Sequence, residues 1–285
     1  MSIKNKKIKL PSGDYMPLVG FGTWLVKGRE STLKTLDMAL EAGYRLFDTA
    51  AMYNNEGDIG DALKELLPRH NLSRKDIFIT TKLYPEDHGK ADKAIESSLK
   101  KLDCDYIDLY LIHWPGTYGK SEHAKMRSKS WEQMVECVKK GFVRNIGVSN
   151  YTVRHLKELL NNDFGIRPAV NQVEWHPFCH QKDLYDFCQK EGILLQAYQS
   201  LGGAGNRDLL ENENIKNIAK KLGKTPAQVL LRWAVQQNVA IIPKSKTKEY
   251  IFSNCELDFT IPEEDMKTLF SFKQTKYDWD PNTIP

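Results

Sequence analysis

The sequence predicts an α/β fold, a (β/α)8 TIM barrel preceded by a β-hairpin. Along the chain a short, largely apolar run is followed repeatedly by a longer amphipathic stretch, and eight such apolar runs occur. Eight βα units in about 250 residues match the usual size of this barrel. The 285 residues contain no linker, low-complexity tract or break in composition. We therefore expect residues 1–285 to form a single domain.

The first predicted element is the hairpin. Residues 7–10 (KIKL) and 15–18 (YMPL) are short runs on either side of the turn-rich residues 11–14 (PSGD). Two short runs around a cluster of turn residues are typical of a β-hairpin.

Eight predicted strands follow the hairpin. Several are almost entirely apolar, as expected for parallel strands that are buried on both faces. They are residues 18–22, 44–47, 77–81, 106–112, 144–148, 169–173, 193–197 and 239–242.

The segments between these strands show helical patterns. Apolar residues recur at helical spacing in residues 32–41, 91–102 and 181–189. Thr225, Pro226 and Gln228 have the spacing of a capping box with proline at the first helical position. Residues 116–130 are polar, and we expect them to form a surface loop that could act as a lid.

An open doubly wound sheet would show the same alternation of strands and helices. Such a sheet would bind a dinucleotide through GxGxxG after its first strand. Here Gly20 and Gly22 are present but the third glycine is absent. This difference favours the barrel.

Composition excludes several classes of function. The 41 basic and 37 acidic residues leave a net charge of only +4, evenly spread, which argues against nucleic-acid binding. No apolar run is long enough to cross a membrane or to act as a signal peptide. The cysteines are an odd number, lie far apart and form no CxxC pair, which argues against a disulfide scaffold and a cysteine metal site. They are Cys104, Cys137, Cys179, Cys188 and Cys255. We expect a cytoplasmic protein without a bound metal.

Polar residues are concentrated where the predicted strands end. In strand order they are Asp48 and Tyr53, Lys82, His113 and Trp114, Ser149 and Asn150, Gln172 and Glu174, Tyr198, and residues 244–247 (KSKT). Active sites of barrels lie at the carboxyl ends of the strands. The pattern therefore predicts a site at that end of the barrel.

Two kinds of chemistry could use this set. In the first, Lys82 pairs with Asp48 and lies near Tyr53. A positive charge about 4 Å from the tyrosine oxygen stabilises the phenolate by roughly 4 kcal/mol at an effective dielectric near 20. This predicts a Tyr53 pKa that is lowered towards neutrality. A phenol tuned in this way is a good general acid. In the second, Lys82 forms a Schiff base, as in a barrel lyase or aldolase. The neighbouring Asp48 argues against the second alternative because it favours the charged amine.

With these residues in this order, the chain resembles the aldo-keto reductases over nearly its whole length. The resemblance rests on motifs in the same order and at the same spacing. They are GFGTW at 20–24, FDTA at 47–50, Tyr53, TKL at 81–83, DLYLIHW at 108–114, IGVSN at 146–150, NQVE at 171–174 and IPKS at 242–245. The resemblance implies a monomeric barrel that binds NADPH without a Rossmann fold.

The resemblance also implies roles for individual residues. Tyr53 is the general acid, Lys82 held by Asp48 lowers its pKa, and His113 orients the carbonyl. The implied cofactor-binding residues are Thr23, Trp24, Asp48, Ser149, Asn150, Gln172, Tyr198, Leu201, Lys244, Ser245 and Thr247. Of these, Ser149, Asn150 and Gln172 hold the carboxamide, and Tyr198 stacks on the nicotinamide. Trp24 and Trp114 are expected to wall the substrate site together with Tyr53 and His113.

Three departures from the family pattern bear on specificity. Tyr250 stands where many relatives have an arginine that grips the cofactor's 2′-phosphate, so NADH is an alternative to NADPH, although Lys246 and Lys248 add positive charge. Gln199 and Ser200 replace the usual Ser-Pro, and the short segment 203–206 argues against a long belt over the cofactor. The tail, residues 273–285, is expected to add one edge of the substrate pocket through Tyr277 and Trp279.

The sequence as a whole predicts NADPH-dependent reduction of aldehydes, and of ketones, to alcohols. Hydride would pass from C4 of the nicotinamide and the proton from Tyr53. The partner would be a small carbonyl compound, with no nucleic acid and no membrane. A lyase that uses Lys82, and a non-catalytic regulatory subunit that binds a nucleotide, are the alternatives.

Overall fold

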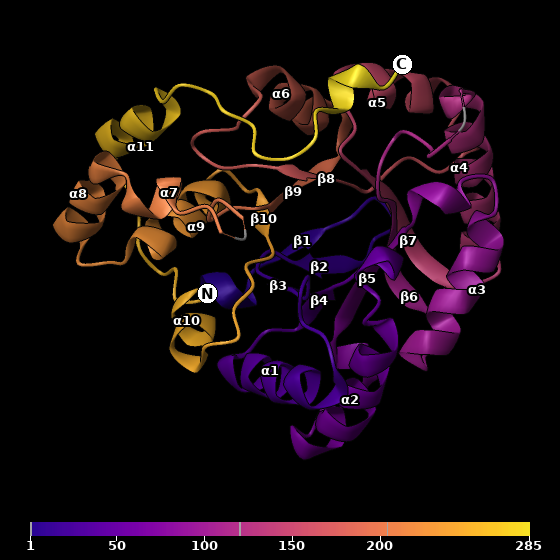
Figure 1. The fold of residues 1–285 in the computed structure, drawn as a ribbon, viewed down its shortest axis with the longest axis horizontal. Coiled ribbons are helices and arrows are strands. Elements are labelled where there is room, and N and C mark those ends of the chain that lie inside the picture. Colours follow the sequence, from indigo (N-terminus) through magenta and orange to yellow (C-terminus); the bar gives the residue numbers. More distant parts are fainter. Residues whose placement is uncertain (1, 120, 204) are drawn as a thin grey trace.

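A computed structural model describes residues 2–119, 121–203 and 205–285, so Lys120 in the predicted loop and Ala204 in the predicted short segment lie outside the described residues. In these described ranges, eight parallel strands form one sheet in sequential order (Figure 1). They are β3 (Phe21–Gly22), β4 (Leu46–Asp48), β5 (Phe78–Leu83), β6 (Ile107–Ile112), β7 (Val143–Ser149), β8 (Val170–Glu174), β9 (Leu194–Tyr198) and β10 (Ala240–Ile241). Each predicted strand is confirmed to within a few residues.

The first and last strands meet and close the barrel. Val19 forms a parallel bridge with Ile241, and the Gly20 amide donates to the Ile241 carbonyl at 2.8 Å. A side chain at Gly22 would place its Cβ 2.7 Å from the carbonyl oxygen of Ile242, closer than real Cβ atoms approach. The two glycines of the partial GxGxxG therefore lie where the strands close, and Gly22 allows the close approach of two backbones.

Helices connect the strands and cover the outside of the barrel, as Figure 1 shows. The helices are α1 (Arg29–Ala42), α2 (Glu56–Arg69), α3 (Ala91–Leu102), α4 (His123–Lys139), α5 (Val153–Asn161), α6 (Lys182–Glu191), α7 (Asp208–Glu211), α8 (Glu213–Leu222), α9 (Pro226–Gln236), α10 (Lys248–Ser253) and α11 (Glu263–Phe270). Single 3-10 turns are η1 (Ile3–Asn5), η2 (Ala51–Tyr53), η3 (Arg74–Asp76), η4 (Pro85–Asp87) and η5 (Pro281–Thr283). The predicted helices correspond to α1, α3 and α6.

Two local predictions have different outcomes. The capping box of α9 is confirmed, because the Gln228 amide donates to Thr225 Oγ1 at 3.1 Å and the Thr225 amide donates to Gln228 Oε1 at 3.0 Å. The prediction of a loop over residues 116–130 is wrong in its second half, because α4 begins at His123. Ser130 and Trp131 of this helix are buried, so contacts with the barrel, which local polarity does not reveal, select the helix.

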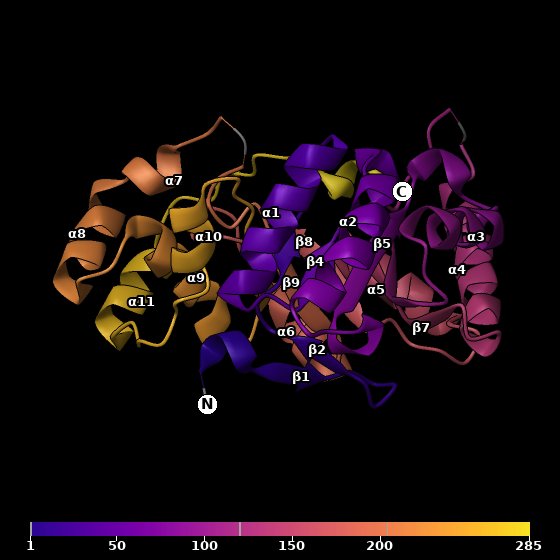
Figure 2. The same ribbon diagram turned by 90° about the horizontal axis from the view of Figure 1, so that it is seen from below.

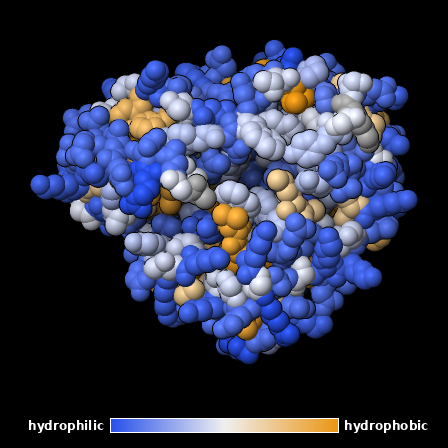
Figure 3. Space-filling view, in the orientation of Figure 1, coloured by the Kyte–Doolittle hydropathy of each residue, from blue (hydrophilic) through white to orange (hydrophobic). Residues whose placement is uncertain are grey.

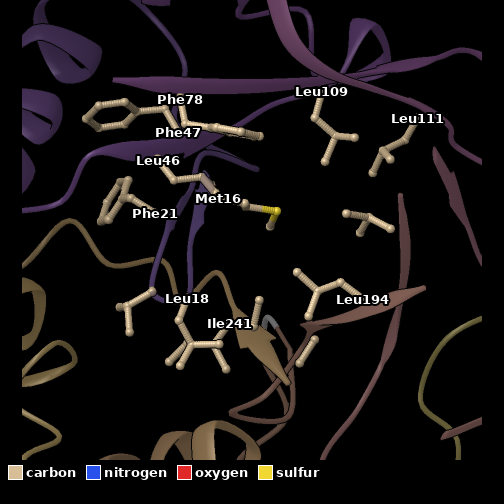
Figure 4. Close-up of a cluster of buried hydrophobic side chains, with 14 of the residues drawn as sticks. Met16, Leu18, Phe21, Leu46, Phe47, Phe78, Leu109, Leu111, Leu194 and Ile241 are labelled. Carbon is tan, nitrogen blue, oxygen red and sulfur yellow. The ribbon is translucent and has the colours of Figure 1, made fainter. Parts of the chain in front are cut away.

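The predicted hairpin forms and closes the amino end of the barrel. Strands β1 (Lys7–Lys9) and β2 (Tyr15–Pro17) pair antiparallel, with Ile8 opposite Met16. Figure 2 shows the hairpin at one end of the barrel and the end of the chain at the other. Met16 is completely buried among Leu18, Leu46 and other side chains from several strands (Figure 4).

The chain's last segment crosses the carboxyl end of the barrel. Arg127 donates to the carbonyl of Pro285 at 2.8 Å, and the His155 ring lies 3.0 Å from the carbonyl oxygen of Ile284. Within the described residues, no helix has the length and apolar character needed to span a membrane. The barrel is thus closed by the hairpin at one end and bordered by the tail at the other.

Candidate active site

A cavity of about 460 Å³ lies at the carboxyl ends of the strands. Figure 3 shows this face of the molecule hollowed near its centre. Most of the predicted site residues line it. They are Thr23, Trp24, Asp48, Tyr53, His113, Trp114, Ser149, Asn150, Gln172, Tyr198, Leu201 and Lys244. The structure therefore brings together residues from seven of the eight strand ends.

Asp48 and Lys82 form a completely buried ion pair. Asp48 ends β4, and Lys82 lies in the neighbouring β5, two residues beyond Thr80, which pairs with Asp48. Lys82 Nζ donates to Asp48 Oδ1 at 2.6 Å. The ammonium also donates to the Thr49 carbonyl at 2.8 Å. Burial opposes the charge on Lys82, but Asp48 and Tyr53 together raise the lysine pKa above its usual value. A lysine held as an ammonium is a poor nucleophile, which argues against the Schiff-base alternative.

Tyr53 lies next to this pair and lines the cavity, with its hydroxyl 3.4 Å from Lys82 Nζ. Lys82 lowers the pKa of Tyr53, as predicted, but the predicted net shift towards neutrality is wrong in this structure. Burial raises the pKa of Tyr53 above its usual value, Lys82 lowers it in part, and Asp48 raises it again. The carboxylate at 2.6 Å from the ammonium cancels much of its field, so desolvation decides the sign.

His113 follows β6 and faces Tyr53. The two rings meet edge to face, with centroids 5.8 Å apart. Burial, with a smaller contribution from Lys82, lowers the pKa of His113 to about 3, so the imidazole is neutral at physiological pH. Its buried Nδ1 has no hydrogen-bond partner among the residues that the structure describes. A neutral histidine beside a protonated tyrosine places two polar groups at one point of the cavity.

One wall of the cavity is a hydrogen-bonded polar network. Ser149 Oγ donates to the Gln172 carbonyl at 2.8 Å, and Tyr198 Oη donates to Asn150 Oδ1 at 2.7 Å. Gln172 Nε2 donates to Asp48 Oδ2 at 2.8 Å and to Gln196 Oε1 at 2.7 Å. The network joins the predicted carboxamide-binding residues to the ion pair. Gln196, in β9, escaped prediction because it lies in the interior of an apolar run, where only a break in apolar character could have indicated it.

A second network fixes the loop that carries Tyr53. Thr23 Oγ1 donates to the Asp48 carbonyl at 2.9 Å. Asn55 Nδ2 donates to the carbonyls of Thr23 and Val26, each at 2.9 Å, while its Oδ1 accepts a bond from Thr49 Oγ1 at 2.7 Å. Asn55 is buried just after η2. This asparagine was missed because an asparagine in a loop ordinarily indicates only a turn.

Of the residues predicted to hold a 2′-phosphate, only some line the cavity. Lys244 lines the cavity, whereas Ser245 and Thr247 lie in the surface loop that leads to α10. The Thr247 amide donates to Ser245 Oγ at 3.0 Å. Tyr250 projects into solvent with 63% of its surface exposed. This loop continues outward from the cavity, so it borders the site without enclosing it.

Aromatic side chains form the outer rim. Trp114 and Trp279 meet edge to face with ring centroids 6.0 Å apart, and Trp24 is 44% exposed at the opening. The tail thus contributes Trp279, as predicted, but Tyr277 does not line the cavity because its ring stacks on His176 at 5.0 Å. Lining residues that escaped prediction include Met52, Pro85, Tyr118 and Asp278. Met52 and Pro85 lie in single 3-10 turns, and Tyr118 and Asp278 lie in loops, where position depends on long-range contacts.

The chemistry of this site is that of proton donation to a bound oxygen. A protonated tyrosine and a neutral histidine face the cavity, and a buried ammonium behind the tyrosine stabilises negative charge on its oxygen when the proton leaves. Within the described part of the chain, no group of three or more His, Cys, Asp or Glu side chains is arranged to hold a metal ion.

Comparisons with known proteins agree with this geometry. A sequence model described as the Aldo/keto reductase family matches residues 18–273. The glyoxal reductase of Bacillus subtilis is 42% identical over 262 residues, which cover 91% of this chain and 90% of that protein. The methylglyoxal reductase DkgA of Escherichia coli is 37% identical over 270 residues, or 94% of each chain.

Solved structures show the same architecture. The aldose reductase from Schistosoma japonicum superposes with a TM-score of 0.86 at 33% identity, over 96% of this chain and 94% of that chain. An aldo-keto reductase from a Medee basin deep-sea metagenome library superposes with a TM-score of 0.86 at 38% identity, over 98% and 100% of the two chains.

Proposed function

The chain belongs to the aldo/keto reductase family and reduces carbonyl groups to alcohols, and from this premise we propose that NADPH supplies the hydride when bound at the barrel mouth and Tyr53 supplies the proton. The observation that carries the proposal is the arrangement of Tyr53, Lys82, Asp48 and His113 around one cavity. Small aldehydes are the proposed substrates.

Tyr53 is suited to the proton step because burial keeps its phenol protonated. When the phenol gives its proton to the carbonyl oxygen, the resulting phenolate faces the ammonium of Lys82 at 3.4 Å. That attraction grows as charge develops on the tyrosine oxygen, so it favours the transition state over the ground state. Asp48 holds the ammonium in place, and the neutral His113 orients the same carbonyl oxygen.

The residues present fit a nicotinamide cofactor. Ser149, Asn150 and Gln172 present amide and hydroxyl groups on one wall, and Tyr198 lines the same side. Lys244 lines the cavity where the loop 244–247 begins, which suits a negatively charged phosphate. We assign Ser245, Thr247 and Lys246 to the same phosphate and therefore propose NADPH, with NADH as the weaker ligand.

Parallel titrations of tryptophan fluorescence with NADPH and NADH test the cofactor. A panel of small aldehydes, followed as loss of reduced-nicotinamide absorbance, tests turnover; it includes glyoxal and methylglyoxal, after which two relatives are named. Tighter binding of NADPH with turnover supports the proposal. Binding of neither cofactor, or turnover with NADH alone, contradicts it.

Borohydride treatment separates reduction from a lyase mechanism. Incubation with a carbonyl substrate and borohydride, without cofactor, leaves a covalent adduct only where a Schiff base forms. Because Lys82 is held as an ammonium by Asp48, we expect intact protein mass to be unchanged. A stable adduct at Lys82 would favour the lyase.

We further propose that the protein acts as a monomer in the cytoplasm. All the residues of the proposed mechanism come from one chain, so a second copy is not needed to complete the site. The five cysteines are all unpaired, which suits a reducing compartment. Light scattering after size exclusion tests the first point, and a mass of twice 32.8 kDa would contradict it.

A further inference from the structure

The part of the tail at residues 276–278 is tied to the barrel by a buried carboxylate, Glu174, at the end of β8. Glu174 Oε1 accepts hydrogen bonds from the Tyr277 amide at 2.7 Å and from His176 Nε2 at 3.0 Å. Glu174 Oε2 accepts from Lys276 Nζ at 2.8 Å and from the Asp278 amide at 3.0 Å. Burial opposes the charge, but these donors outweigh it and lower the pKa of Glu174 to about 2. Glu174 therefore remains a carboxylate and fixes three successive tail residues.

The residues that follow this attachment form the rim of the cavity. Asp278 and Trp279 both line it, and Trp279 packs against Trp114. Asp278 Oδ1 accepts a bond from the Trp279 amide at 2.8 Å, and Gln199 Nε2 donates to Asp278 Oδ2 at 3.3 Å. The Asp278 side chain is exposed, and these two bonds hold its carboxylate between the tail and the loop after β9.

Charge is scarce among the described residues that line the cavity. Three of them carry it: Asp48, Lys244 and Asp278. Asp48 is neutralised by Lys82 at 2.6 Å, and His113 is neutral. Under the proposed function, Lys244 faces the cofactor's phosphate. Asp278 is then the unneutralised charge that a substrate meets at the rim.

We infer that Asp278 is a specificity-determining residue that makes the enzyme prefer neutral carbonyl substrates to those bearing a carboxylate or phosphate group, and that Glu174 is the positioning residue that holds it there. This inference rests on the proposed function, because it concerns the substrate that shares the cavity with the cofactor. Like charges repel, and the repulsion between exposed charges weakens with salt.

A separate observation places Asp278 within electrostatic reach of the reacting group. Burial is the largest cause that raises the pKa of Tyr53, Lys82 lowers it, and Asp48 and, least of all, Asp278 raise it. Asp278 also raises the pKa of Tyr198, after burial of that ring. Because Asp278 lines the same cavity as Tyr53 and His113, a substrate bound there lies within reach of its charge.

The test compares two substrates of nearly equal size, the anionic 4-carboxybenzaldehyde and its neutral methyl ester. The measured quantity is kcat/KM for the acid divided by kcat/KM for the ester. In Asp278→Asn we expect this ratio to rise about tenfold, which corresponds to about 1.4 kcal/mol of relieved repulsion. In Asp278→Lys it should rise further. Raising the salt concentration should raise the ratio in the original protein and leave it nearly constant in Asp278→Asn.

Asp280→Asn is the matched control. Asp280 lies two residues away in the same tail but does not line the cavity, and its side chain caps η5, a role that asparagine also performs. The control should leave the ratio unchanged. An equal rise in both variants, or no rise in Asp278→Asn, would overturn the inference.

Glu174→Gln tests the positioning role. Glutamine has one acceptor oxygen where the carboxylate has two. The hydrogen bond from the backbone amide of either Tyr277 or Asp278 is therefore lost. We expect KM for the ester to rise and the acid-to-ester ratio to move towards that of Asp278→Asn, with kcat less affected. A loss of kcat for both substrates with an unchanged ratio would show that Glu174 has only a structural role.

The inference and the proposed function fail in different ways. If the ester is reduced but the acid-to-ester ratio of kcat/KM does not change on substitution of residue 278, the specificity inference fails and the proposed reductase activity is retained. If neither compound is reduced, the proposed function fails, and quenching of the rim tryptophans by the two compounds still measures the binding preference. Equal affinities of the acid and the ester, unaltered in Asp278→Asn, would then overturn the inference as well.

Discussion

The two ends of the barrel are built from the same strands but have opposite chemistry. At the amino end β4 contributes the apolar Leu46, which packs with the hairpin's Met16 (Figure 4). Two residues later the same strand ends in Asp48, which is equally buried but ionised and paired with Lys82. One end is closed by packing and the other carries the proposed active site.

The difference shows how stability and reactivity are divided along one strand. Apolar burial at the amino end lowers the free energy of the folded state at about 25 cal/mol per Å². A buried ion pair such as Asp48–Lys82 costs desolvation that its attraction does not always repay. We therefore expect changes at the amino end to alter stability, and changes at the carboxyl end to alter activity.

The largest expected effect is on catalysis at the carboxyl end. Tyr53→Phe removes the proposed proton donor, and we expect kcat to fall by about 10²–10⁴-fold. Affinity for NADPH and the melting temperature should change little, because the hydroxyl acts on the substrate oxygen. Steady-state kinetics and cofactor titration measure the two quantities.

Tyr106→Phe is its control, since it removes a hydroxyl from a tyrosine just before β6, at the amino end. This variant should keep full activity. Substantial turnover by Tyr53→Phe would show that another group donates the proton.

The next effect is on stability at the amino end. Met16→Ala leaves a cavity where the hairpin enters the barrel, and we expect a loss of about 2–5 kcal/mol in the free energy of unfolding. Tyr15→Ala on the opposite, 58% exposed face of the same strand should cost much less. Urea denaturation measures both variants, and kcat/KM below the transition should be retained. If Met16→Ala lost activity without losing stability, the division between the two ends would be wrong.

Acid should destabilise the protein through its carboxyl end. Burial lowers the pKa of His113 to about 3 and that of His155 to about 4, both below the value of about 6.5 in an unfolded chain. Below pH 6.5 the unfolded state therefore binds more protons than the folded state, and stability falls as the pH falls, by up to about 1.4 kcal/mol per pH unit for each histidine. This loss continues to about pH 4 for His155 and about pH 3 for His113. Glu174, whose pKa is lowered to about 2, adds a further loss below about pH 4.5.

Unfolding measured from pH 7 to pH 4 tests this expectation. His113→Gln should make the free energy of unfolding less dependent on pH. Met16→Ala should lower that free energy by a similar amount at every pH. An unaltered slope in His113→Gln would show that this ring is not held neutral by burial.

The smallest expected effect concerns the cofactor. Tyr250→Arg places a guanidinium on α10 beside the loop proposed to hold the 2′-phosphate, and we expect NADPH to bind several-fold more tightly while NADH changes little. Phe270→Arg adds the same charge on α11 as a control. Equal tightening of both cofactors would indicate a general electrostatic effect in place of phosphate recognition.

Much of the fold and of the site could be predicted because both depend on local pattern. Each buried strand reads as an apolar run, and a barrel places the ends of all its strands at one mouth. Asp48, Lys82 and His113 could therefore be assigned to one site from their positions after successive runs. Twelve of the predicted site residues line the cavity for this reason.

Other features depend on contacts between distant parts of the chain. Gln196 and Asn55 hold site residues in place, yet their own neighbours in sequence do not indicate it. Asp278 rather than Tyr277 reaches the cavity because Glu174, more than a hundred residues earlier, fixes the tail. Local polarity also misplaced the start of α4, since the helix is selected by packing on the barrel.

The sequence by itself determined the barrel, the end at which the site lies and most of the chemical groups that the site contains. Only the tertiary structure decided the protonation of those groups. The pKa of Tyr53 is raised because burial and Asp48 together outweigh Lys82, and the sign of that balance depends on distances and solvent exclusion that no spacing in the sequence encodes. Periodicity is a local property, whereas an electrostatic field is a sum over the whole fold.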